Sequence, residues 1–132
     1  MIIQSKRVWI GSQFIPAQLE VTGEKISRIY AWGEKKADID YENARLVPGF
    51  IDVHTHGAYG FDTNDGTPEG LRHWMRHIPE EGVTSINPTT VSQMPDVLTA
   101  AAANVAAVID EGYEGAEILG IHFEGPYLDM EY

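Results

Sequence analysis

Apolar and polar positions follow two different patterns along this chain, and the change comes near residue 48. Before it, short stretches rich in β-branched and aromatic residues alternate with turn formers, which is typical of strands. Four such stretches lie at residues 7–10, 19–21, 25–30 and 45–47. Gly23 lies in a turn that favours a hairpin between the second and third of them. The polar segment 38–43 is expected to be a loop.

From residue 48 onward, strand patterns alternate with helix patterns. The apolar strand that contains Phe50, Ile51 and Val53 is expected to be buried. The elements expected after it are a helix capped by Thr67, a strand 83–87 stopped by Pro88, a helix from about Ser92 to Glu111, and a strand 117–123. Strands alternating with helices predict βαβ units and a parallel sheet.

The first of these helices carries a stripe of apolar residues at helical spacing. Pro68 suits the first position of a helix, and the stripe predicts one face packed on the sheet. The stripe consists of Leu71, Trp74, Met75 and Ile78. These residues are therefore expected to form the core of this region.

The 132 residues are too few for a complete barrel of alternating parallel strands and helices. A (β/α)8 barrel takes about 250 residues, and three strands with their helices do not close one. We therefore expect an α/β fold that is a truncated piece of a larger enzyme, in which residues 1–47 could be a small β-sandwich that needs strands from elsewhere. The alternative is a small three-layer α/β domain.

Composition narrows the chemistry. The formal net charge of -11 argues against a nucleic-acid partner. The chain has no cysteine, so a metal would have to use His and carboxylate ligands, which suit zinc, iron or manganese. No apolar run approaches the roughly 20 residues that span a bilayer, which argues against a membrane partner. The N-terminus lacks a signal-peptide pattern, so a cytoplasmic location is expected.

His54 and His56 are the strongest candidates for metal ligands. Because side chains alternate along a strand, Asp52 lies on the same face as both histidines, whereas Ile51 and Val53 point toward a covering layer. The alternative is a chance HxH pair on a solvated edge, but an apolar strand before the histidines and glycines after them favour a metal site at the end of the strand. Asp52 could orient one imidazole, or hold the end of the strand by hydrogen bonds.

Glu124 follows the third predicted strand, in the position that the histidines occupy after the first. Functional residues of parallel α/β proteins gather at the carboxyl ends of strands, so Glu124 is a candidate third ligand. The alternative is a solvated loop residue. His122 lies on the same face and could contact the ligands or substrate, or be a hydrogen-bonded core histidine.

Other polar residues are weaker candidates for the functional site. His73 and His77 have the spacing of two helical ligands, but no Glu follows His73, so the HExxH pattern is absent. We expect them on the solvated side of their helix. Asp62 and Asp65 could belong to the site, but they are better explained as turn formers.

Several motifs resemble a known family. Residues 46–56 look like the metal-binding first strand of the amidohydrolase superfamily. Within it, residues 56–65 and 120–128 resemble the N-acetylglucosamine-6-phosphate deacetylase family, and the second motif, with Glu in place of a carbamylated Lys, is the more specific. Residues 82–85 and 87–89 extend the resemblance to the whole chain.

The resemblance implies a fold and a set of ligands: the chain would be an α/β protein, the N-terminal part of a metal-dependent TIM-barrel hydrolase preceded by half of a small β-sandwich. Residues 1–47 would be the N-terminal part of a β-sandwich, and residues 48–132 the first βα units of an incomplete (β/α)8 barrel. His54 and His56 match the ligands of one divalent ion, and Glu124 matches the ligand of a second or shared ion, so one or two ions are expected per complete site. The general acid or base, an Asp, would lie beyond Tyr132.

The resemblance also implies a function. The full-length enzyme, a homodimer, would remove the acetyl group of N-acetylglucosamine 6-phosphate in amino-sugar catabolism, and the 132 residues alone would be inactive. One alternative is another amidohydrolase, such as a deaminase or a cyclic-amide hydrolase. The other is a metal-binding or interaction fragment without turnover.

Overall fold

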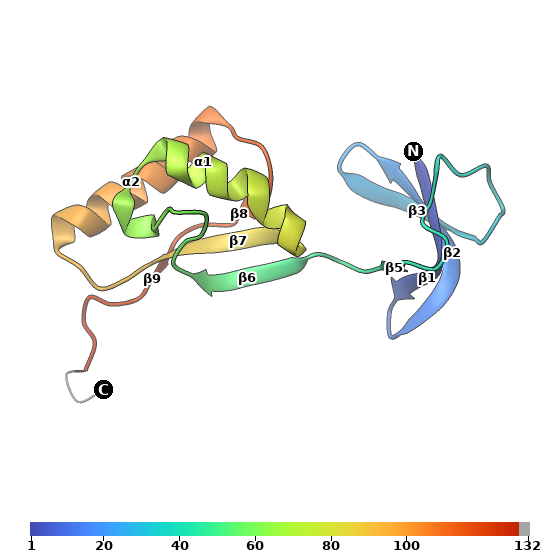
Figure 1. The fold of residues 1–132 in the computed structure, drawn as a ribbon, viewed down its shortest axis with the longest axis horizontal. Helices are drawn as coiled ribbons and strands as arrows, with labels where there is room; N and C mark the ends of the chain where they lie inside the picture. Colours follow the sequence, from blue (N-terminus) through green and yellow to red (C-terminus); the bar gives the residue numbers. More distant parts are fainter. Residues whose placement is uncertain (130–132) are drawn as a thin grey trace. The chain divides into compact units, whose positions relative to one another are not determined.

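The computed structural model describes residues 1–129, and the chain divides into two compact units, Met1–Pro48 and Gly49–Tyr132. Figure 1 traces both along the chain. The first unit is a β-sheet, and the second combines a parallel sheet with helices. In the described part of the chain, neither helix is long and apolar enough to cross a membrane.

The first unit is a five-stranded sheet. Its strands are β1 (Ile2–Ile10), β2 (Gln13–Thr22), β3 (Lys25–Ala31), β4 (Ile39–Asp40) and β5 (Arg45–Leu46). The first three strands form an antiparallel meander, in which Gly23 adopts the positive φ that the predicted hairpin turn requires. The hairpin is therefore confirmed.

The predicted loop at residues 38–43 contains a strand. β4 pairs in parallel with β1, with Ile3 opposite Ile39, and the Asp38 carboxylate accepts a hydrogen bond from the Ile2 N–H at 2.6 Å. The expectation of a loop was wrong because this strand forms by pairing with a distant segment. Local alternation carries no sign of that pairing.

The second unit is a parallel sheet with two helices. Its elements are β6 (Phe50–Thr55), α1 (Pro68–His77), β7 (Val83–Thr90), α2 (Pro95–Glu111), β8 (Glu117–Ile118) and β9 (His122–Phe123), with 3-10 turns η1 (Thr63–Asp65) and η2 (Ile78–Glu81). The strand order is β6-β7-β8, and β9 also pairs with β7. Figure 1 shows both helices on the same side of this sheet. The predicted alternation and the parallel pairing are confirmed.

The predicted helical stripe forms the core of the second unit. Leu71, Trp74 and Met75 are fully buried, and they cluster with Ile86 of β7 and Val108 of α2. Thr67 occupies the position before the helix, but its side chain makes no capping hydrogen bond. The helix is therefore stabilised mainly by burial of this stripe, because most helical stability in proteins comes from tertiary packing.

Two predicted strand ends were wrong. β7 continues through Pro88 to Thr90, because its pairing with β6 is irregular there and Thr89 and Thr90 pair with β9; proline is tolerated in strands at such irregular positions. The strand expected at 117–123 is two short strands, both paired with β7 and separated by a break at Gly120.

β6 is not the buried strand that its sequence predicts. Phe50, Ile51 and Val53 are 69%, 63% and 57% exposed. Within the described residues β6 is the edge strand and pairs only with β7, while the helices pack on Ile86 of β7. The covering layer expected over Ile51 and Val53 is therefore absent from residues 1–129.

Candidate metal centre

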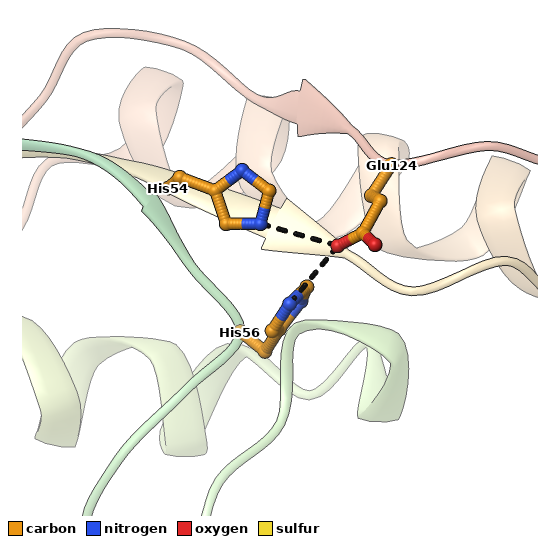
Figure 2. A group of neighbouring side chains, drawn as sticks. All are labelled: His54, His56 and Glu124. Atoms are coloured by element: carbon orange, nitrogen blue, oxygen red, sulfur yellow. Dashed lines mark hydrogen bonds and ion pairs between the residues drawn. The ribbon is translucent and has the colours of Figure 1, made fainter. Parts of the chain in front are cut away.

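Three predicted site residues meet at the carboxyl ends of the parallel strands. His54 lies in β6, His56 follows its last residue, and Glu124 follows β9. The Nε2 atoms of His54 and His56 each lie 3.1 Å from the same Glu124 oxygen, Oε2 (Figure 2). Parallel strands put their carboxyl ends at one edge, which explains how residues 70 positions apart come together.

The imidazole of His56 is held in one tautomer. Its Nδ1 lies 3.2 Å from the backbone oxygen of Thr89, which can only accept, so Nδ1 carries the proton. The Nε2 atom of His56 therefore faces the Glu124 carboxylate, and in the neutral ring it presents its lone pair to it. Two facing lone pairs repel each other, so a proton or a divalent cation between Nε2 and Oε2 would stabilise this contact.

The three side chains fit a divalent ion. Their donor atoms all lie within 4.8 Å of one another, and within residues 1–129 no other group of three His, Asp or Glu does so. Zinc bonds of 2.0–2.1 Å at tetrahedral angles separate neighbouring ligand atoms by about 3.3 Å, close to the observed separations from Oε2. Two histidines and a carboxylate with an open fourth position are the donor set of hydrolytic zinc sites.

The carboxyl end of β7 positions both parts of this group. The buried Thr89 hydroxyl accepts the Thr55 N–H at 3.1 Å where the β6 ladder is irregular, and the Thr89 carbonyl orients His56. The Glu124 N–H donates to the Thr90 carbonyl at 3.3 Å, and the Ser92 hydroxyl donates to the Glu124 carbonyl at 3.2 Å.

Sequence reasoning did not identify Thr89 as a site residue. Residues 87–89 were noted only because they resemble a family motif. A threonine near the end of a strand has no chemical signature that marks it as a site residue. Its part in orienting His56 depends on the pairing of β6 with β7, which only the structure shows.

The loop after β6 holds the backbone of His56. The N–H and the hydroxyl of Thr63 both donate to the His56 carbonyl, at 2.7 and 2.8 Å. A side chain at Gly57 would collide with the backbone of Phe61, so this close approach requires glycine. The Asn64 amide binds both the N–H and the carbonyl of Val91, which ties the loop to the segment after β7.

The structure shows what the other candidate residues near the site contact. Asp62 and Asp65 form a reciprocal capping box on η1, so both are turn formers as expected. Asp52 accepts the backbone N–H of His54 at 3.0 Å and thus holds the end of the strand, the second of its two possible roles. His122 is exposed, with its ring centroid 4.9 Å from that of His54, so the core alternative was wrong.

Comparisons with known proteins identify the family of this chain. The model of the amidohydrolase family matches residues 45–131. An N-acetylglucosamine-6-phosphate deacetylase from Vibrio furnissii is 38% identical over 129 residues, which cover 95% of this chain and 32% of that protein. An N-acetylgalactosamine-6-phosphate deacetylase from Escherichia coli O157:H7 is 40% identical over 83 residues, 63% of this chain and 22% of that protein.

A solved structure shows the same likeness. The chain superposes on an N-acetyl-D-glucosamine-6-phosphate deacetylase variant from Mycobacterium smegmatis, in complex with N-acetyl-D-glucosamine-6-phosphate, with a TM-score of 0.80 and 27% identity. The match covers 98% of this chain and 33% of that one. The chain thus spans about a third of the length of these two relatives.

Proposed function

The chain belongs to the amidohydrolase family, and we propose that it is part of a metal-dependent deacetylase acting on N-acetylglucosamine 6-phosphate. Water would cleave the acetamide C–N bond, giving acetate and the free amine of glucosamine 6-phosphate. The observation that carries the proposal is the convergence of His54, His56 and Glu124, with His56 held in the tautomer of a metal ligand. The names of the relatives support the choice of substrate.

Each residue of the group has a defined role in this proposal. His54 and His56 bind the ion through Nε2, and the charge of Glu124 offsets the charge of the ion. Thr89 keeps the proton of His56 on Nδ1, which leaves Nε2 free. A bound zinc, iron or manganese ion would polarise the amide carbonyl and lower the pKa of water toward about 7. The complete site would hold one or two such ions, with Glu124 as a ligand of the second ion or of both.

The activity is proposed for a protein of the relatives' length. The 132 residues offer three donor groups to this metal centre, and the Asp that transfers protons is expected outside them. Losing a positioned general acid or base costs roughly 10²–10⁴-fold in rate, so the chain alone should not turn over. In the longer protein, 1–47 would be part of a β-sandwich and 48–132 the first units of a (β/α)8 barrel, within a cytoplasmic homodimer.

The substrate is tested by measuring acetate release. The full-length protein is incubated with N-acetylglucosamine 6-phosphate and, separately, with the galactosamine epimer, because a relative at 40% identity is named for that epimer. We expect the glucosamine substrate to give the higher kcat/KM. A higher value for the epimer would reassign the substrate, and activity on neither, with turnover of a cyclic amide or an amine, would make it another amidohydrolase.

The metal ligands are tested by elemental analysis of the same protein. His54→Ala combined with His56→Ala should remove about one ion per subunit, and Glu124→Ala should remove more, because a bridging carboxylate contacts both ions. Ser12→Ala, on the turn between β1 and β2, is the control and should leave the metal content unchanged. Equal losses in the His and Glu variants would contradict the bridging role, and bound metal without acetate release would favour a fragment that binds without turnover.

A further inference from the structure

A second pair of imidazoles lies on α1. His73 and His77 are one helical turn apart, and their ring centroids are 4.5 Å from each other with planes inclined by 57°. Two histidines at this spacing on one helix face can bind a single ion, as they do in zinc hydrolases. Neither belongs to the group formed by His54, His56 and Glu124.

A carboxylate orients one of the two rings. The Nδ1 atom of His77 lies 3.2 Å from Oε1 of Glu80 in η2. An ionised carboxylate only accepts hydrogen bonds, so Nδ1 of His77 carries a proton, and in the neutral ring Nε2 is the nitrogen with the lone pair. A carboxylate on the far nitrogen is the usual partner of a metal-binding histidine, because it fixes the tautomer and raises the basicity of the ligand.

The charges around the pair favour a cation. The two arginines of the helix are engaged with α2 and the segment after it, Arg72 with Glu111 at 2.6 Å and Arg76 with Glu114 at 3.8 Å. His77 instead contacts Glu80 of η2, and the neighbouring Glu81 is the partner of the Tyr59 hydroxyl. The sequence shows histidines and arginines on one helix, and the structure shows that the arginines have acidic partners elsewhere.

Tyr59 closes one side of the pair. Its ring centroid is 6.2 Å from that of His73 and 5.7 Å from that of His77. Its hydroxyl donates to the Glu81 carboxylate at 2.6 Å, and this hydrogen bond raises the pKa of Tyr59 to about 12. The phenol is thus engaged by Glu81, which leaves the imidazoles as the ligands.

We propose that His73 and His77 form a second divalent-metal site, with zinc as the ion and Glu80 as the residue that positions His77. Imidazole is a good ligand for zinc, and water would complete the coordination of an exposed two-histidine site. This site is independent of the proposed deacetylase activity, because it shares no residue with the metal centre at the strand ends.

The test isolates this pair from the first centre. In a chain carrying His54→Ala and His56→Ala, equilibrium dialysis against zinc sulphate should detect a bound ion. Adding His73→Ala or His73→Gln should remove it, and adding Glu80→Gln should weaken it roughly tenfold. Arg76→Ala, an exposed change on the same helix, is the matched control and should leave the affinity unchanged.

The ring signals of the histidines give an independent reading. Zinc should shift the nitrogen resonances of His73 and His77 together in the NMR spectrum of the same chain. Zinc binding that survives both His73 variants would overturn the site, as would a shift of only one ring. An affinity unaffected by Glu80→Gln would overturn the positioning role of Glu80. Circular dichroism of each variant confirms that the helix is intact.

Discussion

The two units of this chain differ in how much of the apolar face of their sheet is covered. In Met1–Pro48, the buried hydrophobic cluster contains Val8, Ala17 and Leu19. In Gly49–Tyr132, the cluster has ten members, because α1 and α2 pack against the parallel sheet. A sheet buries its apolar face only against a second layer, and in the described residues only the second unit contains helices that form one.

The consequence is visible on the first unit. An open apolar cavity of about 520 Å³ lies on its sheet, bordered by residues that include Trp9, Val21, Ile26 and Ile29. Ile26 and Ile29 are 60% and 53% exposed. Buried polar groups of this unit do find hydrogen-bond partners. The side-chain amide of Gln18, which is buried, is hydrogen-bonded to Gln4 and to the backbone of Lys35. This unit is thus held together by its backbone ladders and polar contacts more than by apolar burial.

The largest expected effect on stability comes from replacing a buried leucine by alanine, once in each unit. Leu71→Ala removes a fully buried side chain from the ten-residue cluster and should cost about 3–5 kcal/mol of the unfolding free energy. Leu19→Ala, 9% exposed in the smaller cluster, should cost about 2 kcal/mol. Hydrogen exchange of amides in β7 and β1 would report the two units separately. A larger loss for Leu19→Ala would break the comparison.

Zinc is expected to stabilise the second unit and to leave the first unit unchanged. In a His73→Ala chain, which lacks the proposed second site, zinc at 100 times its dissociation constant should stabilise the second unit by about 2.7 kcal/mol. Amides of β1 in the first unit should exchange at unchanged rates. Adding His54→Ala and His56→Ala should abolish the protection. Equal protection of both units would mean that zinc does not act through the strand-end centre.

A smaller effect is expected at Thr89. Thr89→Val removes the hydroxyl that accepts the Thr55 N–H, which loosens the strand end that carries His54 and His56. Zinc affinity in the His73→Ala chain should fall roughly tenfold. Thr89→Ser keeps the hydroxyl and should restore the affinity, which separates positioning from packing. If the serine and valine variants bind zinc equally well, the hydroxyl does not position the ligands.

The smallest effect on stability is expected on the open face of the first unit. Ile26→Lys replaces an exposed apolar side chain, so the unfolding free energy should change by no more than about 0.5 kcal/mol. Self-association, measured by sedimentation velocity at increasing concentration, should decrease because apolar surface is lost. Glu24→Gln changes the net charge by the same amount without removing apolar surface, and it should leave association unchanged.

The sequence by itself determined the elements whose signals are local. The stripe of Leu71, Trp74 and Met75 predicted α1 and its buried face, and Gly23 predicted the hairpin. The spacing of His54 and His56 and the placement of Glu124 after a strand identified the three candidate ligands. These signals depend on helical or strand periodicity and on the chemistry of single side chains, which are properties of short segments.

Only the tertiary structure decided how distant segments pair. β4 forms by pairing with β1, β7 continues through Pro88 where its ladder with β6 is irregular, and β6 is exposed because no described element covers it. The same pairing places the Thr89 carbonyl against His56, which sets the tautomer of that ligand. Hydrogen bonds and packing between residues far apart in the chain decide these features, and no local pattern encodes which partner a strand will find.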